Sequence, residues 1–292
     1  MTSAQPRIGS LPRSLPAAVT DRVGDEPWEL YPTPGATSVD LRWPGSAWQV
    51  GHHQVRRAAP AVIDAAVERH RWLAERRVQP ELVVADGEWL VTVGPGHPAH
   101  HPERQPVPDE VPALIGKALR LIHDLDVTEC PFAAAWDQQV AAIEQAVAAG
   151  RVDAAALPSP YDRYDPGRLV TVIHETRPSS EPSDDLVVCH GTPVVPNLFL
   201  DSGRFAGWTG LARLGVADRH ADLAVAHRSI HALFGPDAVF GFYEGYGAEP
   251  DLVALDHYIL IDVVLAAVAQ PDPAPSEPSL PDAPATGSEF EA

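Results

Sequence analysis

The spacing of apolar residues changes along the chain, and this change constrains the fold more than any other feature. Up to about residue 94, short apolar runs alternate with Pro- and Gly-rich segments such as PTPGATS and WPGSAW, which predicts strands joined by turns. Within this part the sequence also predicts a helix at 61–76 and a hairpin at 82–93. After a Pro-rich linker, apolar residues recur every three to four positions, which is typical of helices. We therefore expect an α+β fold with a small strand-rich lobe and a larger, mostly helical lobe.

The predicted elements divide the chain into four segments. The larger lobe is expected to contain helices at 112–125, 132–149, 167–175, 218–234 and 251–268, with short strands at 185–189 and 198–207; further strands are expected at 38–43 and 47–55. The last segment is rich in Pro, Ala and acids and cannot bury enough apolar surface to offset its ordering entropy. The four segments are a flexible N-terminal segment 1–25, a small α+β lobe 26–94, a helical lobe 95–268, and a disordered tail 269–292.

The net charge and the other composition features exclude several classes of function. Forty acidic residues against 21 basic ones give a formal charge of −19, which argues against nucleic-acid and anionic-lipid partners. No stretch has the roughly 18 apolar residues of a membrane helix, and the first residues lack the apolar core of a signal peptide. Cys130 and Cys189 are far apart and form no CxxC motif, so we expect reduced thiols in a cytoplasmic protein.

The most informative stretch lies between Asp185 and Ile230. It contains the motifs HGT at 190–192, PN at 196–197, GRF at 203–205 and GVADRHAD at 215–222. This stretch closely resembles the catalytic core of the aminoglycoside phosphotransferases, in particular the kanamycin/neomycin-type enzymes. Further resemblance lies in LIHDLDVTECPF, AAGRVD and YILID, so that it covers residues 112–265. The resemblance implies a two-lobed protein-kinase-like fold and the parts for ATP- and Mg²⁺-dependent phosphoryl transfer.

Two central groups of that chemistry are replaced in this chain. The resemblance places the family's catalytic aspartate at Thr192, beside His190, and its metal-binding aspartate at Gly210. A threonine hydroxyl accepts no proton near neutral pH, and glycine has no side chain to bind a metal. Asn197 remains as an amide ligand and by itself makes a weak Mg²⁺ site.

The phosphate-binding lysine is also missing. Lys117 is the only lysine of the chain, and it lies in the first helix of the larger lobe. On the family pattern Arg56 takes the lysine position, with the same charge but a different geometry, and the partner glutamate falls on Ala66. The resemblance also places Arg213 on the cofactor side of the site.

The substrate side has lost acids as well. The family's polyamine substrates need anionic partners, yet only Asp262 of its C-terminal acids remains, and Arg228 is followed by serine instead of an acid. We interpret three further charged residues as a network that supports the fold, namely Asp218, Arg219 and Asp222.

Three hypotheses follow for the function. The favoured one is a catalytically impaired, pseudokinase-like member of this family that binds a small molecule, a nucleotide or a protein partner in the cleft between the lobes. The alternative is an active ATP-dependent O-phosphotransferase of a small hydroxylated substrate, in which relocated acids (Asp201, Asp218 or Asp222) hold the metal; only then are ATP and Mg²⁺ cofactors. The third is an interaction scaffold that uses the acidic surface. A metal site at His52-His53 or at residues 97–101 is disfavoured, because these histidines lie in Pro- and Gly-rich segments.

Overall fold

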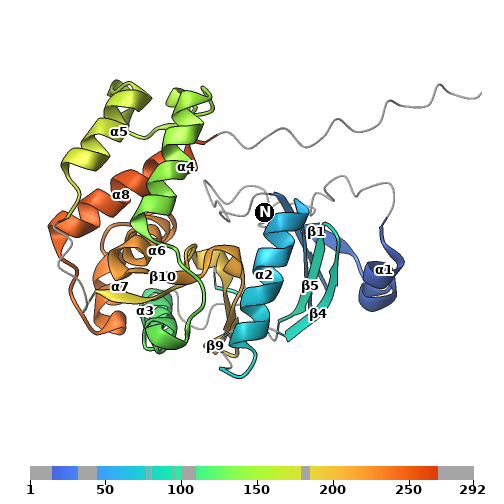
Figure 1. Cartoon of the computed structure of the whole chain (residues 1–292). Helices are drawn as coiled ribbons and strands as arrows, with labels where there is room; N and C mark the ends of the chain where they lie inside the picture. The colour runs from blue at the N-terminus through green and yellow to red at the C-terminus, as the bar shows by residue number, and fades with distance from the viewer. Residues whose placement is uncertain are drawn as a thin grey trace, which may run out of the picture.

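The computed structural model describes residues 15–31, 45–76, 78, 81–94, 96–99, 110–178 and 185–268. Figure 1 shows a sheet on one side, a group of helices on the other, and one long helix between them. This is the expected α+β, two-lobed kinase-like architecture. The predicted tail 269–292, the predicted strand at 38–43 and most of the predicted linker lie outside the described residues.

The small lobe is built on an antiparallel five-stranded sheet with the order β1-β2-β3-β5-β4. Its strands are β1 (Trp28–Leu30), β2 (Gly45–Val50), β3 (His53–Ala58), β4 (Glu81–Asp86) and β5 (Trp89–Val93). The helix α2 (Pro60–Leu73) follows β3. The predicted hairpin at 82–93 is confirmed. The single strand predicted at 47–55 is wrong, because Gly51 adopts a φ of 55° and turns the chain between β2 and β3.

The N-terminal part is more ordered than we expected for a flexible segment. Residues Ala17–Val23 form helix α1, in which Val19 and Val23 are buried. These two side chains belong to a cluster around Trp48 and Trp28. Two valines four positions apart therefore present one apolar face of a short helix to the sheet, and this packing stabilises a segment that its prolines had suggested to be irregular. Residues 1–14 lie outside the described part.

The larger lobe contains the helices that were predicted and one that was not. Helix α7 is short and contains two glycines, which weakens its helical signal in the sequence. Two small antiparallel sheets, β10-β7 and β6-β8-β9, lie among the helices. The elements are β6 (His97–Pro98), α3 (Val111–His123), η2 (Val127–Glu129), α4 (Trp136–Ala148), η3 (Ala154–Ala156), η4 (Tyr161–Arg163), α5 (Pro166–Glu175), β7 (Leu186–Cys189), η5 (Val195–Asn197), β8 (Leu198–Asp201), β9 (Arg204–Trp208), η6 (Leu211–Arg213), β10 (Gly215–Asp218), α6 (Arg219–Phe234), α7 (Ala238–Tyr246) and α8 (Leu252–Ala266).

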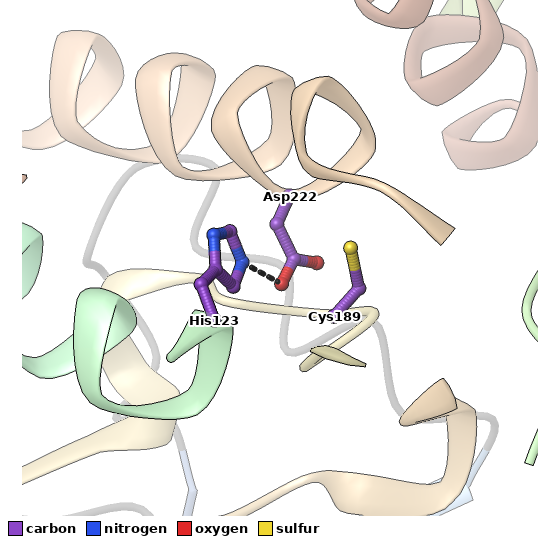
Figure 2. A group of neighbouring side chains, drawn as sticks. All are labelled: His123, Cys189 and Asp222. Carbon is purple, nitrogen blue, oxygen red and sulfur yellow. Dashed lines mark hydrogen bonds and ion pairs between the residues drawn. The ribbon is translucent and has the colours of Figure 1, made fainter. Parts of the chain in front are cut away.

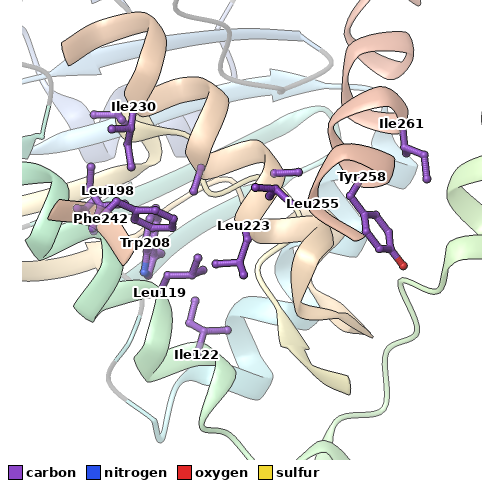
Figure 3. Close-up of a cluster of buried hydrophobic side chains, with 14 of the residues drawn as sticks. Leu119, Ile122, Leu198, Trp208, Leu223, Ile230, Phe242, Leu255, Tyr258 and Ile261 are labelled. Atoms are coloured by element: carbon purple, nitrogen blue, oxygen red, sulfur yellow. The ribbon is translucent and has the colours of Figure 1, made fainter. Parts of the chain in front are cut away.

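The core of the larger lobe holds the end of β9 in place. Figure 3 shows Trp208 among apolar side chains of α3, α6 and α7. Trp208 is fully buried, and its indole N–H donates to the carbonyl oxygen of Ala118 at 3.1 Å. The residues that follow, Thr209 and Gly210, are thereby fixed at the floor of the candidate site. Among the described residues, no helix has both the length and the apolar character needed to cross a membrane.

Helices α3 and α7 approach each other closely at two glycines. A Cβ atom added to Gly116 would lie 2.2 Å from the carbonyl oxygen of Phe242, and one added to Gly245 would lie 2.1 Å from that of Ala113. Both neighbours are backbone atoms, so a side chain at either position requires the two helices to move apart.

We expect Gly116→Ala to lower the free energy of unfolding by about 3 kcal/mol or more, because overpacking against backbone cannot be relieved by a rotamer change. The control is Gly241→Ala on α7, where the added Cβ meets only Pro112 Cβ at 3.8 Å and alanine favours the helix. Urea unfolding followed by circular dichroism measures both. Equal stabilities of the two variants would contradict the close helix crossing.

Candidate active site

The loop after β7 is anchored by a buried carboxylate. Asp222 on α6 accepts hydrogen bonds from the backbone N–H of His190 at 2.6 Å and of Gly191 at 2.8 Å. Its Oδ2 also lies 3.0 Å from Nε2 of His123, which comes from α3 (Figure 2). Hydrogen bonds to a charged acceptor are the strong ones, and burial strengthens them further. Asp222 therefore sets the shape of the loop that carries residue 192.

The same carboxylate lies in a His-Cys-Asp cluster that has the composition of a metal site. One potential ligand atom each of His123, Cys189 and Asp222 lies within 4.8 Å of the others. Figure 2 shows how these three side chains lie. A metal needs the thiolate form of cysteine, yet burial raises the pKa of Cys189 well above its ordinary value, and its Sγ lies 3.4 Å from the carbonyl oxygen of Asp218. With Asp222 already accepting from the loop, the cluster serves as an anchor of the loop.

Thr192 and Gly210, where the sequence resemblance predicts the family's two aspartates, face each other. The Thr192 hydroxyl donates to the carbonyl oxygen of Gly210 at 2.8 Å, and both residues are in the interior of the site. Gly210 has a φ of 78°, and a Cβ added there would lie 2.7 Å from Nδ2 of Asn197. The space that an acidic side chain would need at position 210 is therefore occupied by the amide of Asn197.

Asn197 is held in this orientation by both of its amide atoms. Its Nδ2 donates to the carbonyl oxygen of Thr192 at 2.9 Å, and its Oδ1 accepts from Arg56 at 3.0 Å. This Oδ1 is the atom that would bind a metal. It is used by a guanidinium instead.

Arg56 on β3 is buried deeply and joins the two lobes. Only 2% of it is exposed. Its Nη2 donates to Asn197 Oδ1 and, at 2.9 Å, to Thr209 Oγ1, while Nε donates to Gln54 Oε1 at 3.0 Å. These three oxygens are neutral, and burial lowers the pKa of Arg56 to about 10. The guanidinium therefore remains charged at neutral pH and places a fixed cation at the floor of the cleft.

Tyr31 closes the same region from the end of β1. Its hydroxyl donates to the carbonyl oxygen of Pro196, and its ring packs against Phe199 with centroids 6.3 Å apart. The side chain is buried, and burial raises the pKa of the Tyr31 hydroxyl. Side chains of β1 and β3 are thus both inserted against the loop of residues 196–199.

A pocket of about 220 Å³ lies beside Thr192. It is lined by Arg69 of α2 and by residues of α4, α6, α8 and η6. Asp262 and Arg213 contribute to its wall. Asp262 forms an ion pair with Arg228, so the structure brings these two predicted substrate residues together at this pocket.

The remaining predicted residues have bonds within the fold. The carboxylate of Asp218 accepts from the backbone N–H of His220 at 2.8 Å and so caps α6. Arg219 forms an ion pair with Asp185 at 2.7 Å. Asp218, Arg219 and Asp222 thus each contact other parts of the fold.

His190 is completely buried and is held in its neutral form. Its ring lies 4.8 Å from the ring of Trp208, centroid to centroid, and its Nδ1 accepts from the backbone N–H of Thr192 at 3.1 Å. Burial lowers the pKa of His190 to about 4, although the charge of Asp222 opposes this shift. A protonated His190 would lose the bond to Thr192, so the loop requires the neutral ring.

Sequence reasoning missed three groups of this site: Thr209, Gln54 and Tyr31. Gln54 and Arg56 are two positions apart on a strand and therefore point to the same face of the sheet. The available signal for Gln54 was this pair of polar residues on a face of the sheet that is otherwise buried. Thr209 and Tyr31 become recognisable only when the lobes are assembled, since they lie 153 and 165 positions from their partners.

The fold and the paired positions 192 and 210 define a kinase-like phosphotransferase architecture. The family model described as "Phosphotransferase enzyme family" matches residues 49–258. The chain is 35% identical over 215 residues to an aminoglycoside 3'-phosphotransferase of Streptomyces fradiae, which covers 68% of this chain and 78% of that protein. It is 31% identical to a streptomycin 3''-kinase of Streptomyces griseus over 80% of this chain and 97% of the relative.

Solved structures show the same similarity. The crystal structure of an aminoglycoside-3'-phosphotransferase of type VIII superimposes with a TM-score of 0.67 and 28% identity, covering 85% of this chain and 97% of that one. The chain belongs to the aminoglycoside phosphotransferase family.

We expect Asp222→Asn to lower the free energy of unfolding by about 3 kcal/mol, because it removes the buried carboxylate that accepts from two loop N–H groups and leaves one of these groups facing an amide N–H₂. The matched control is Asp124→Asn, which removes the exposed, i,i+4 ion pair with Arg120 and is expected to cost less than about 0.5 kcal/mol. Urea unfolding measures both variants. A loss as small as that of the control would show that the loop does not depend on Asp222.

The neutral state of His190 predicts a pH dependence of stability. In the unfolded chain this histidine takes up a proton near its ordinary pKa of 6.5, and in the folded chain only near pH 4. The unfolded state therefore binds more protons between these values, so the free energy of unfolding falls as the pH is lowered through this window. The contribution of His190 is about 3 kcal/mol.

Urea unfolding at a series of pH values from 7 to 4 gives the slope of the free energy of unfolding against pH. For His190→Gln this slope is expected to be smaller than that of the unaltered protein, by the amount that corresponds to about one bound proton. The control is His174→Gln, since the side chain of His174 is 49% exposed and pairs with Glu144. An unchanged slope in His190→Gln would contradict the buried neutral ring.

Proposed function

We propose that this protein is a catalytically impaired member of the aminoglycoside phosphotransferase family that uses the cleft between its lobes to bind a ligand. The carrying observation is the hydrogen bonding of the Arg56 guanidinium to Asn197 and Thr209, because the resemblance places the family's lysine at position 56 and an amide metal ligand at Asn197. The residues at these positions affect three parts of the family's chemistry: proton transfer, metal binding and the contact with the phosphates.

Proton transfer lacks an acceptor at position 192. Phosphoryl transfer requires a carboxylate to orient or deprotonate the attacking hydroxyl. The Thr192 hydroxyl donates its proton to the Gly210 carbonyl oxygen, and its oxygen carries no charge. It therefore offers an incoming hydroxyl group at most a neutral acceptor.

Metal binding is opposed by both geometry and charge. Mg²⁺ requires several hard oxygen ligands in octahedral geometry, but Oδ1 of Asn197 accepts from a cation. Because like charges at such short separation repel strongly in a buried site, a divalent ion would have to displace the Arg56 guanidinium. The residues that are present do not fit Mg²⁺ in this arrangement.

The alternative, an active O-phosphotransferase with relocated ligands, is favoured by the identity of 35% to an aminoglycoside 3'-phosphotransferase. The three candidate acids have other roles in the fold. Asp222 anchors the loop, Asp218 caps α6, and Asp201 is exposed at the end of β8, where it pairs with β9. This alternative predicts that replacing Asn197 or Asp218 abolishes turnover and that Thr192→Asp changes little.

We expect ATP, GTP and ADP to cause no Mg²⁺-dependent rise of the melting temperature, since a ligand stabilises a protein only through binding to the folded state. The measurement is a thermal-shift titration of each nucleotide with Mg²⁺ and with EDTA, together with an assay for ATP-dependent phosphorylation of kanamycin. A shift that requires Mg²⁺, or phosphorylation of kanamycin, would establish the active alternative.

A set of variants tests the reason for the impairment. The double variant Thr192→Asp with Gly210→Asp is expected to remain without Mg²⁺ dependence, because Asn197 still occupies the space beside position 210. Adding Arg56→Lys shortens the cation and releases Asn197, so the triple variant is expected to gain a Mg²⁺-dependent shift with ATP. In the matched control, Arg57→Lys replaces Arg56→Lys; Arg57 is the exposed neighbour on β3 that pairs with Glu88.

A further inference from the structure

Another hollow of the larger lobe lies away from the pocket beside Thr192. It is a groove of about 890 Å³ between α6, α7 and the start of α8. Among the described residues, none lines both hollows. Figure 1 shows α7 on the side of the larger lobe that faces away from the sheet of the small lobe. The groove is therefore separate from the cleft between the lobes.

The floor of the groove is apolar and is fixed by packing and by a hydrogen bond. Val239 of α7 and Leu255 of α8 line it and are buried. The hydroxyl of Tyr243 lies 3.0 Å from Nδ1 of His227, so both rings of this wall are held in place. Burial and the charge of His231 lower the pKa of His227, which keeps this ring neutral at neutral pH. The groove thus exists before a partner binds and gains no positive charge from His227.

The apolar side chains at the opening of the groove are exposed to water. Phe240 of α7 is 77% exposed and Leu252 of α8 is 70% exposed, and the neighbouring Val253 is exposed to a similar extent. Exposed apolar patches bordered by polar residues are typical of protein interaction sites. A small molecule on the floor would leave these side chains in water. An amphipathic helix, with apolar side chains at positions i, i+3, i+4 and i+7, covers both the floor and the opening.

The charged residues around the groove are acidic. Glu244 and Glu249 line it, and Asp237 and Asp251 lie at its two ends next to lining prolines in the sequence. All four are exposed. Among the described residues that line the groove, none is Lys or Arg. Charge complementarity therefore favours a partner whose helix carries basic residues beside its apolar face.

The same charges disfavour two occupants that this chain could supply. Residues 269–292 contain five acids and no basic residue, so they would bring negative charge to an acidic groove. A second copy of the chain has a formal charge of −19, and a two-fold interface would place Glu244 and Glu249 of both copies together. Like charges brought together in an interface are unfavourable.

We propose that this groove docks a basic amphipathic helix of a partner protein. The apolar face of that helix covers Phe240, Leu252 and the floor, and its Lys or Arg side chains face Glu244 and Glu249. This inference goes beyond the proposed function, because the groove is separate from the cleft and its occupation needs neither a nucleotide nor a metal. It gives the larger lobe an interaction surface of its own.

The test uses three fluorescein-labelled peptides of about 18 residues, a length at which a helix spans five turns. The first consists of Leu and Lys, with Leu at i, i+3, i+4 and i+7. The second has Glu in place of Lys, and the third has the composition of the first in an order without an apolar face. Fluorescence anisotropy with the full chain at physiological salt measures each dissociation constant. The first peptide is expected to bind about tenfold more tightly than the other two.

Equal binding of the first and third peptides would show attraction by net charge alone and would overturn the proposal. Tighter binding of the Glu peptide would overturn it as well.

Substitutions at the opening of the groove locate the binding. Phe240→Ser combined with Leu252→Ser removes the exposed apolar contacts and is expected to weaken the Leu/Lys peptide about tenfold. Both side chains are mostly exposed, so the folded state is retained. The matched control is Tyr164→Ser, since Tyr164 is an exposed aromatic residue outside the groove. An equal effect of the control, or no effect of the double variant, would contradict docking in the groove.

A second pair of variants separates local charge from total charge. Glu244→Gln combined with Glu249→Gln is expected to weaken the Leu/Lys peptide about fivefold and to reduce the salt dependence of its binding. Glu68→Gln combined with Glu81→Gln makes the same change of net charge at two exposed acids of the small lobe. Equal weakening by both pairs would overturn the assignment of the basic partner to this groove.

The two other occupants are tested directly. A synthetic copy of residues 269–292 is expected not to displace the Leu/Lys peptide, and sedimentation velocity is expected to give the same oligomeric state with and without the Phe240 and Leu252 substitutions. Displacement by the synthetic copy, or a dimer that these substitutions dissociate, would overturn the proposal.

Discussion

The buried guanidinium of Arg56 is the interaction on which the rest of the candidate site depends. It is almost fully shielded from water, and its bonds reach Gln54 on its own strand and Asn197 and Thr209 in the other lobe. An ionised group removed from water is tolerated only where its protons find acceptors. The orientations of Asn197 and Thr209 follow from this requirement, and the amide of Asn197 in turn occupies the space beside Gly210. One buried charge thus determines the conformation of the whole floor of the cleft.

On the proposed function, the residues at positions 56, 192 and 210 are physically coupled for the same reason. The family's chemistry balances two carboxylates against a lysine and Mg²⁺. Without the metal, two buried carboxylates would repel each other and remain partly unpaired, which costs several kcal/mol. Neutral Thr192 and Gly210 remove that repulsion, and their bond to each other satisfies the hydroxyl. A single cation bonded to neutral oxygens is then a self-consistent arrangement. Introducing the family's residue at only one of these three positions would leave an unpaired charge or cause a steric clash.

How much of the molecule the sequence predicts depends on whether a signal is local. The helices α2, α3, α4, α5, α6 and α8 were predicted because each carries its own apolar periodicity, and the motifs at residues 190–222 identified the loop and its positions. The turn at Gly51 was missed because only Gly51 and His52 separate β2 from β3. Helix α7 was missed because its glycines are explained only by the helix α3 across from it. The bonds from Arg56 to Asn197 and Thr209 were not predicted, since these residues lie 141 and 153 positions away. Such contacts arise from the packing of the lobes, which no local pattern encodes.

The conformation of the loop after β7 and its chemistry depend on different residues. Asp222 holds the backbone of His190 and Gly191 from α6, and the neutral ring of His190 holds that of Thr192. None of these bonds uses a side chain at position 192 or 210. These bonds that hold the loop, and with it the floor of the pocket beside Thr192, are therefore independent of the side chains at positions 192 and 210. Of the charged residues that line this pocket, Asp222 is an anchor of the loop, whereas Asp262 is not. Ligand preference can accordingly change on this fold while the anchored loop is retained.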